Sequence, residues 1–311
     1  MPTPEVFFMD QSVKSLMITY YHHSGFSCAL GDTLLVFDYW TGEHGELPEE
    51  RRITREMLEA YRQVYVFISH EHLDHYDPVV YTWQSLGNVR YILSDDMRIA
   101  VSGDRMKPGS TLTLNQGLTV KAFESTDLGV AFLVEIDGIR IFHAGDLNFW
   151  HWRDESSVRE IAEAEEDFNK AIEPLRQEKI DVAFFPVDPR QGMMYDAGAN
   201  TFIMSIKPRL MIPMHFWGRR SIASEFARHS RTRDTGIMAL TRFGEQLQVD
   251  FAENGHMTVR PLTPPDIIMP VRPESALPVV EPRRHSTDVD LDTLSEQDPF
   301  SDTDLPVTME E

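Results

Sequence analysis

The sequence predicts a single mixed α/β domain that spans about residues 16–260 of the 311-residue chain. Over this span, short apolar runs rich in β-branched and aromatic residues alternate with turn signals, as is typical of sheets. The dipeptide Asp137-Gly138 separates two such runs and predicts a hairpin. Residues 156–177 repeat apolar side chains at helical spacing among many acids, which predicts a helix packed by one face on a sheet.

Two pairs of apolar runs are predicted to form adjacent antiparallel strands. SLMITYY and TLLVFDY flank Gly31-Asp32, and GVAFLVEI and IRIFHAG flank Asp137-Gly138. Dipeptides of this kind support the tight turns that join neighbouring strands.

Two further runs, VYVFISH and DVAFFPV, are apolar throughout and end in polar residues. They are predicted to be buried strands that deliver side chains to a rim at their carboxyl ends. Residues 221–230 are a second helix candidate.

The charge balance argues against a nucleic-acid-binding protein. The chain carries 50 acidic residues against 29 Lys and Arg, a net charge of -21. Phosphate contacts need clustered Lys and Arg, so a small-molecule substrate is the expected partner.

The composition changes after about residue 262. Six prolines fall between Pro264 and Pro282, and the chain from Ser286 onward has many acids and no Lys or Arg. We therefore predict one domain over residues 1–262 and a disordered, solubilising tail over residues 263–311.

Cys28 is the only cysteine, which excludes an intramolecular disulfide and a thiolate zinc cluster. Any metal must therefore be held by histidines and carboxylates. The amino terminus lacks a positive region followed by an apolar run, and no stretch approaches the roughly 18 apolar residues of a membrane span. These features predict a cytoplasmic protein that does not interact with membranes; they do not indicate an oligomeric state.

The most informative segment is VFISHEHLDHYDP, residues 66–78. It places His70, His72, Asp74 and His75 within six positions directly after a strand. Alternate residues of an extended backbone point to the same side, and the following loop can bring Asp74 and His75 to a neighbouring point. Neutral imidazoles and a carboxylate suit zinc, manganese or iron, so this segment predicts a metal site.

The run His70-Glu71-His72-Leu73-Asp74-His75 resembles the H-x-H-x-D-H signature of the metallo-β-lactamase-fold hydrolases. Two later phrases extend this resemblance. Asp146 in IFHAGDLN matches the Gly-Asp step that bridges two metals in this family, and His215 in LMIPMHFWG matches its last metal-binding histidine. The segments YYHHSGF, FDYW and FHAGD look most like the L-ascorbate-6-phosphate lactonase-like branch.

The resemblance implies a four-layer αββα sandwich with the metals at one edge. It also implies a ligand set: His70 and His72 for a first metal, Asp74, His75 and His215 for a second, and Asp146 shared between them. The expected cofactor is Zn²⁺, one or two ions, with Mn²⁺ or Fe²⁺ as alternatives.

The sequence departs from the family pattern at one position. Members normally place another histidine, which is a ligand of the first metal, before the Asp-Gly hairpin. At that position this chain has Phe123-Glu124-Ser125-Thr126-Asp127. Asp127 or Glu124 could replace that histidine, or His151 could reach the site from the later HW pair. Alternatively, only the second site is well occupied.

Several other residues have two possible roles. His143 is more consistent with a supporting or core position than with a ligand, and His22 or His23 could line a pocket or make a structural hydrogen bond. Trp150, Trp152, Phe216 and Trp217 could form an aromatic wall for substrate.

Polar residues near the later motifs are also open to two interpretations. Arg219 and Arg220 could bind a substrate anion or form a solvated pair at a helix start. Asp188 or Arg190 could orient a metal ligand or an anion.

The predicted function is a metal-dependent hydrolase in which a metal-bound hydroxide attacks the carbonyl or phosphoryl centre of a small lactone, ester, amide or phosphodiester. Asp74 is the predicted catalytic residue, because it can orient or deprotonate the water. Two alternatives stay open: a non-catalytic metal-binding module with a degenerate first site, and a nuclease of the same fold.

Overall fold

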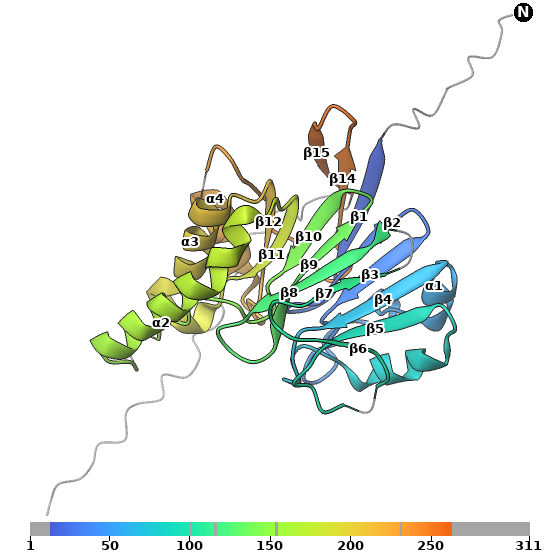
Figure 1. Ribbon diagram of the computed structural model, residues 1–311, viewed down its shortest axis with the longest axis horizontal. Coiled ribbons are helices and arrows are strands. Elements are labelled where there is room, and N and C mark those ends of the chain that lie inside the picture. Colours follow the sequence, from blue (N-terminus) through green and yellow to red (C-terminus); the bar gives the residue numbers. More distant parts are fainter. Residues whose placement is uncertain (1–12, 100, 115–116, 153–154, 231, 263–311) are drawn as a thin grey trace, which may run out of the picture. The chain divides into compact units, whose positions relative to one another are not determined.

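The computed structural model describes residues 13–262, apart from residues 100, 115–116, 153–154 and 231. The predicted acidic tail, residues 263–311, lies outside the described residues. Two β-sheets and the helices that flank them make up the described part (Figure 1).

The first sheet has eight strands in the order β15-β14-β1-β2-β3-β4-β5-β6. Their bounds are β1 Lys14–Tyr20, β2 Phe26–Leu30, β3 Thr33–Phe37, β4 Gln63–Ile68, β5 Val89–Ser94, β6 Asp104–Met106, β14 Gln246–Phe251 and β15 Met257–Pro261.

The second sheet has seven strands in the order β13-β12-β11-β10-β9-β8-β7. Their bounds are β7 Thr111–Thr113, β8 Thr119–Glu124, β9 Val130–Ile136, β10 Ile139–His143, β11 Val182–Pro186, β12 Leu210–Met214 and β13 Gly236–Ile237.

Four α-helices and four described 3-10 helices connect these strands. Their bounds are α1 Arg55–Glu59, α2 Val158–Ile172, α3 Ala197–Ile206, α4 Arg220–His229, η1 Glu49–Arg51, η2 Pro78–Ser85, η4 Glu173–Gln177 and η5 Pro189–Met194.

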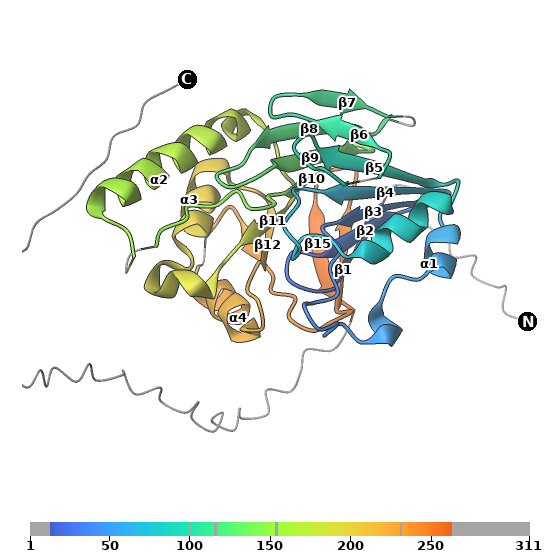
Figure 2. The ribbon, with the colours of Figure 1, turned by 90° about the horizontal axis from the view of Figure 1, so that it is seen from below.

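Strands in both sheets carry apolar side chains on both of their faces. One face of each sheet packs against the other sheet, and the opposite face packs against helices. On β3, Leu35 and Phe37 belong to the core between the sheets, whereas Leu34 and Val36 pack with Leu58 of α1 on the outer face. Helices α2, α3 and α4 contribute apolar residues to the core on the outer face of the second sheet (Figure 2). The predicted four-layer αββα sandwich is therefore confirmed.

The local predictions are confirmed at three places. Strands β9 and β10 pair across Asp137-Gly138, where both residues have the positive φ that this turn requires. Helix α2 starts with a capping box of Ser157 and Glu160, and the chain continues into η4 up to Gln177. Helix α4 occupies the second predicted helical stretch.

One strand prediction is wrong. The runs SLMITYY and TLLVFDY are not neighbours, because β2 pairs antiparallel with both β1 and β3 and lies between them. Gly31-Asp32 instead joins β2 to β3. The run FSCAL of β2 is short and contains small residues, so its strand pattern is weak in the sequence.

The strand directions place the polar residues at one edge. Strands β3, β4 and β5 are parallel in the first sheet, and β10, β11 and β12 are parallel in the second. The carboxyl ends of parallel strands share an edge, which is where open α/β sheets place their ligand sites. No helix within the described ranges is long and apolar enough to cross a membrane, and a cytoplasmic location stays a prediction.

Candidate metal centre

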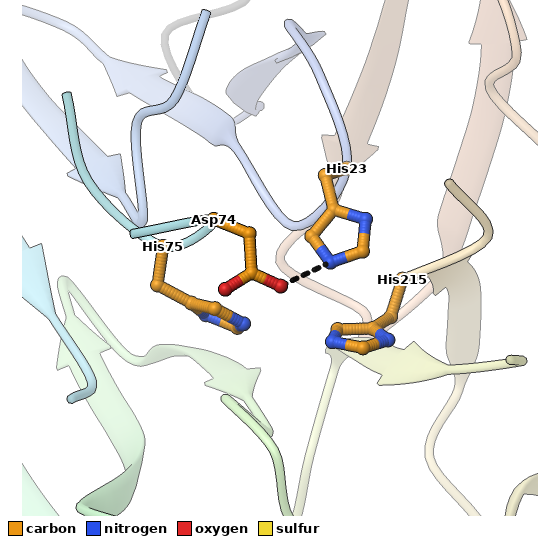
Figure 3. A group of neighbouring side chains, drawn as sticks. All are labelled: His23, Asp74, His75 and His215. Atoms are coloured by element: carbon orange, nitrogen blue, oxygen red, sulfur yellow. Dashed lines mark ion pairs between the residues drawn. The ribbon is translucent and has the colours of Figure 1, made fainter. Parts of the chain in front are cut away.

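Two groups of metal-binding side chains lie at this edge. His70, His72 and Asp146 form the first group, and His23, Asp74, His75 and His215 form the second. In each group the ligand atoms lie within 4.8 Å of one another. Figure 3 shows the imidazoles of the second group facing the Asp74 carboxylate from three separate loops. The structure therefore brings together all six ligands expected from the resemblance and adds His23.

Asp146 lies between the two groups. Its Oδ1 is 3.0 Å from Nε2 of His75 and 3.1 Å from Nε2 of His215, and its Oδ2 is 3.4 Å from Nε2 of His70. Burial alone raises the pKa of Asp146, but His75 and His215 outweigh it and hold that pKa well below the usual range. This position suits a carboxylate shared by two cations.

Two further carboxylates support the histidines of the second group. Nδ1 of His75 is 2.8 Å from Oδ2 of Asp38, and Nδ1 of His215 is 3.0 Å from Oδ2 of Asp188. Such bonds fix the ring so that its other nitrogen faces the centre. Sequence reasoning considered Asp188 for this role but missed Asp38, whose signal is an acid directly after the apolar strand TLLVF.

Asp38 also ties the signature loop to the first sheet. Its carboxylate accepts hydrogen bonds from the backbone N–H of Ser69 at 2.8 Å and from the hydroxyl of Ser69 at 2.6 Å. Oγ of Ser69 is in turn 3.0 Å from Nδ1 of His70. One buried acid therefore positions a ligand of each group.

Close backbone contact between the sheets holds this arrangement. Gly129 has a positive φ, and a Cβ there would lie 2.0 Å from the carbonyl oxygen of Ser69. A Cβ on Gly145, which also has a positive φ, would lie 2.8 Å from the Cβ of Ser69. Only glycine fits at these two positions, so the loop that carries His70 can lie directly against the second sheet.

The electrostatics of the centre favour a cation. Burial alone lowers the pKa of His215, but Asp146 and Asp188 outweigh it and raise that pKa to about 9. The pKa of His75 is also raised, because Asp146 and Asp38 outweigh its burial. His23 behaves differently, since burial lowers its pKa to about 3 and the ring is neutral at pH 7.

The hydrogen bonding of the donor atoms shows whether a metal ion fits between them. Nε2 of His70, His75 and His215 and Oδ1 of Asp146 are buried and have no hydrogen-bond partner among the described residues. An unsatisfied buried polar atom costs about 1–3 kcal/mol. Four such atoms converging on one place, all of them nitrogen or carboxylate oxygen, fit a divalent metal ion.

The first group lacks the fourth family ligand, as the sequence indicates. The Thr126 hydroxyl donates to the carbonyl of Asn148 at 2.5 Å and accepts from its backbone N–H at 2.9 Å. Asp127 lines the same cavity as His72, whereas Glu124 lines a neighbouring cavity beside α2. His151 packs on Phe149 and belongs to neither metal-binding group. Of the three predicted replacements, only Asp127 lines the cavity that His72 and Asp146 also line, and it belongs to neither metal-binding group.

A cavity of about 480 Å³ opens beside both groups. His72, Asp74, Asp146 and His215 form its polar floor. Its remaining lining residues are Thr126, Asp127, Trp150, Trp152, Arg190 and Trp217.

Three of the four predicted aromatic residues line this cavity. Trp150 and Trp152 stack with a centroid separation of 5.7 Å, and Trp217 packs against His23 at 4.6 Å. Phe216 instead is fully buried and packs on Tyr20.

Arg190 is the arginine that faces the cavity. Its guanidinium lies 4.7 Å from the ring centre of Trp217, and its Nε donates to both carboxylate oxygens of Asp188. Arg219 and Arg220 are exposed at the start of α4 and do not line the cavity, and Arg220 lies over Phe243. The sequence could not separate these arginines because loop geometry decides which of them points inward.

Two further histidines are buried near the centre and belong to neither group. Nε2 of His143 lies 2.9 Å from the carbonyl of Ser24, and Nδ1 accepts from the backbone N–H of Gly145, so neither nitrogen is free to bind a metal. His22 is buried between Trp40 and Phe243 and belongs to neither group.

Known proteins share this architecture. Residues 17–163, a little under half of the chain, match the family described as "Beta-lactamase superfamily domain". Igni18, a metallo hydrolase from the archaeon Ignicoccus hospitalis, is 16% identical with a TM-score of 0.55, and the match covers 75% of this chain and 98% of that one. A candidate metal-dependent hydrolase from Parabacteroides distasonis is 18% identical with a TM-score of 0.54, covering 73% and 93%.

The matched span contains His70, His72, Asp74, His75 and Asp146, and the structure adds His215 from the segment beyond it. The domain match, the four-layer fold and the position of the ligand groups agree with one another. The chain therefore has the metallo-β-lactamase fold, and residues 17–163 are similar to the β-lactamase superfamily domain.

Proposed function

We propose that this protein hydrolyses a small molecule by attack of water on a carbonyl or phosphoryl centre. The observation that carries the proposal is the set of buried, partnerless donor atoms, two of which, on Asp146 and His215, belong to residues that line the cavity. A purely structural metal site is closed by protein ligands, whereas a catalytic one stays open to a substrate.

The reaction needs an activated water and a polarised bond. The two groups of histidines and aspartates would hold the metal ions that supply both, since a bound divalent ion would lower the pKa of water and polarise the bond under attack. Asp74 lies half-buried at the cavity floor, and its contacts with His23 and His75 keep its pKa below the usual range in spite of burial. We propose that this ionised carboxylate accepts a hydrogen bond from the attacking water and orients it.

Zinc is the proposed metal. Five imidazoles and two carboxylates that converge without a thiolate suit zinc, and manganese or iron fit the same donors. Neither of the two alternative functions gains support from a particular feature of the described residues.

The cavity walls indicate the kind of substrate. Arg190 is held by Asp188 and stacked on Trp217, which leaves its Nη1 side without a protein partner among the described residues. A guanidinium fixed in this way can bind a carboxylate or phosphate, while Trp150 and Trp152 cover an apolar part of the molecule. We propose a substrate that carries an anionic group beside the scissile bond.

Asp146→Asn tests the proposal, because it replaces the negative carboxylate between the two groups by a neutral amide with only one oxygen donor. Wild type and variant are assayed for bound metal and for hydrolysis of a panel of lactones, carboxylic esters, amides and phosphodiesters, each with and without an added carboxylate. Asp137→Asn is the matched control, since it makes the same chemical change in the hairpin between β9 and β10.

We expect the wild type and the control to bind metal and to hydrolyse at least one class, and Asp146→Asn to lose both properties. Metal binding with no turnover on any class would support the non-catalytic module instead. Turnover that persists without metal would contradict the proposal.

A further inference from the structure

His23 is placed like a metal ligand, although the resemblance assigns it no such role. It lies between β1 and β2, and its side chain is fully buried. Neither Nδ1 nor Nε2 makes a hydrogen bond to any described residue. A buried imidazole with two partnerless nitrogens is rare in a folded protein, because each nitrogen loses its bond to water.

The geometry directs His23 at the second group. Its Nε2 is 3.3 Å from Oδ2 of Asp74, and its ring centre is 4.0 Å from that of His215 (Figure 3). Trp217 packs on the other side of the ring at 4.6 Å. The ring is therefore held where its donor atom lies within reach of the same ion as Asp74 and His215.

The backbone supports this placement. His23 and His215 both have a positive φ, of 52° and 63°, which side-chain-bearing residues adopt uncommonly. The backbone N–H of His215 donates to the carbonyl of His23 at 3.3 Å, so the two loops are tied together at the two histidines. Such strained positions cluster at functional sites.

We infer that His23 binds the second metal as an additional imidazole ligand. The first group lacks the histidine that the resemblance places within residues 123–127, whereas His23 adds an imidazole to the second group. The second site then has four ligands of its own besides the shared Asp146, whereas the first has His70 and His72. Exchangeable positions for water and substrate are accordingly assigned to the first site, beside the exposed His72.

A supporting role is the competing explanation. In that case the N–H of His23 would orient Asp74 without touching the metal. The contact at 3.3 Å is an ion-pair distance without the geometry of a hydrogen bond, and Nδ1 has no partner either. These observations favour a ligand.

The test measures metal binding, because the inference rests on the metal centre of the proposed function and not on its hydrolysis. Full-length wild type, His23→Ala and His23→Gln are stripped with a chelator and titrated with Zn²⁺ and with Co²⁺. Competition with a coloured chelator gives the two affinities, and the visible spectrum of Co²⁺ reports on its coordination. His22→Ala is the control, since it removes a neighbouring buried histidine outside both groups.

We expect both His23 variants to lower the affinity for the second metal by roughly 100-fold or more and to change the Co²⁺ spectrum. A loss of this size is the upper end of what the loss of a supporting residue causes. The His23 variants should keep the wild-type affinity for the first metal, and His22→Ala should keep the wild-type affinity for both metals. Wild-type binding by His23→Gln, whose amide keeps a donor toward Asp74, would overturn the inference, as would wild-type binding by His23→Ala.

A measurement on the unmutated protein keeps the inference testable if both variants fail to fold. Imidazole ¹⁵N NMR of the wild type shows whether Nε2 of His23 loses its proton when zinc is added. A proton retained on Nε2 in the zinc-loaded protein overturns the inference. Metal binding through His23 without turnover on any substrate would refute the proposed function alone.

Discussion

The two metal-binding groups share Asp146 but differ in how the protein supports them. In the second group, His75 and His215 are buried, and each is held by its own carboxylate, Asp38 or Asp188. In the first group, His72 is exposed, and Nδ1 of His70 contacts the hydroxyl of Ser69, which in turn donates to Asp38. The histidines of the second group are therefore more deeply buried and more directly supported by carboxylates than the exposed His72 of the first.

This difference has a physical cause in the fold. The second group lies where the loop after β12 meets the loop between β1 and β2, so it is enclosed by both sheets. The cavity is lined by His72 and Asp146 of the first group and by Asp74 and His215 of the second, and of these four side chains His72 is the exposed one. An open coordination position on the cavity side is what a hydrolytic centre requires.

The largest expected effect separates the two groups directly. We expect His215→Asn to release the second metal and to lower hydrolysis by more than roughly 100-fold, because a ligand is lost together with the support from Asp188. Asparagine suits the positive φ at position 215, so the backbone is not disturbed. His72→Asn should release only the first metal. Metal content by mass spectrometry and turnover are measured on both.

The same pair of variants can break the comparison. If His72→Asn releases both metals, the second site depends on the first, and the two groups are not independent. If each variant lowers the occupancy of both sites equally, the assignment of the ligands to two separate ions is wrong.

The second prediction uses pH on the metal-free protein. His215 has a folded pKa of about 9 against 6.5 for the free side chain, because Asp146 and Asp188 outweigh its burial. A raised pKa stabilises the fold fully below pH 6.5, and this contribution disappears as the pH rises to about 9. A shift of this size corresponds to about 3 kcal/mol.

Thermal and urea unfolding in the presence of a chelator should therefore show stability falling between pH 6.5 and 9, with a smaller fall in His215→Asn. His70 of the first group has its pKa lowered by burial and by His75, so it adds nothing in this window. A flat profile for the wild type would mean that the carboxylates around His215 do not act as the structure indicates.

The third prediction concerns the support and not the ligands. Asp188→Asn keeps the shape of the side chain that holds Nδ1 of His215 but removes its charge. We expect a 10- to 100-fold loss of affinity for the second metal, as is typical of residues behind a ligand. Asp127→Asn makes the same change at the cavity wall, outside both metal-binding groups, and should change the affinity for the second metal less.

The sequence was sufficient for the parts of the centre that are local. His70, His72, Asp74 and His75 lie in one short segment, and Asp146 and His215 each follow a strong strand pattern. The hairpin at Asp137-Gly138 and helix α2 were predictable for the same reason, because turn chemistry and helical spacing act within a few residues.

The parts that the sequence did not predict depend on contacts between distant segments. His23 reaches the second group only because the loop after β1 is bonded to the loop after β12. Asp38 acts through its position beside Ser69 on the neighbouring parallel strand, and Arg190 faces the cavity because Asp188 and Trp217 hold it there. A strand such as β2, with weak local pattern, is likewise defined by its two neighbours.

The smallest expected effect concerns the cavity wall and leaves both metals in place. Arg190→Lys keeps the positive charge but removes the planar group that stacks on Trp217 and pairs with Asp188. We expect KM for a substrate with an anionic group to rise by about tenfold, the size of one lost charge-assisted hydrogen bond, with kcat little changed. For the matched neutral substrate KM should stay the same, and equal rises for both would assign Arg190 to the support of His215 through Asp188 instead of to the substrate. Because that supporting role passes through the second metal, metal content measured on the same samples separates the two explanations.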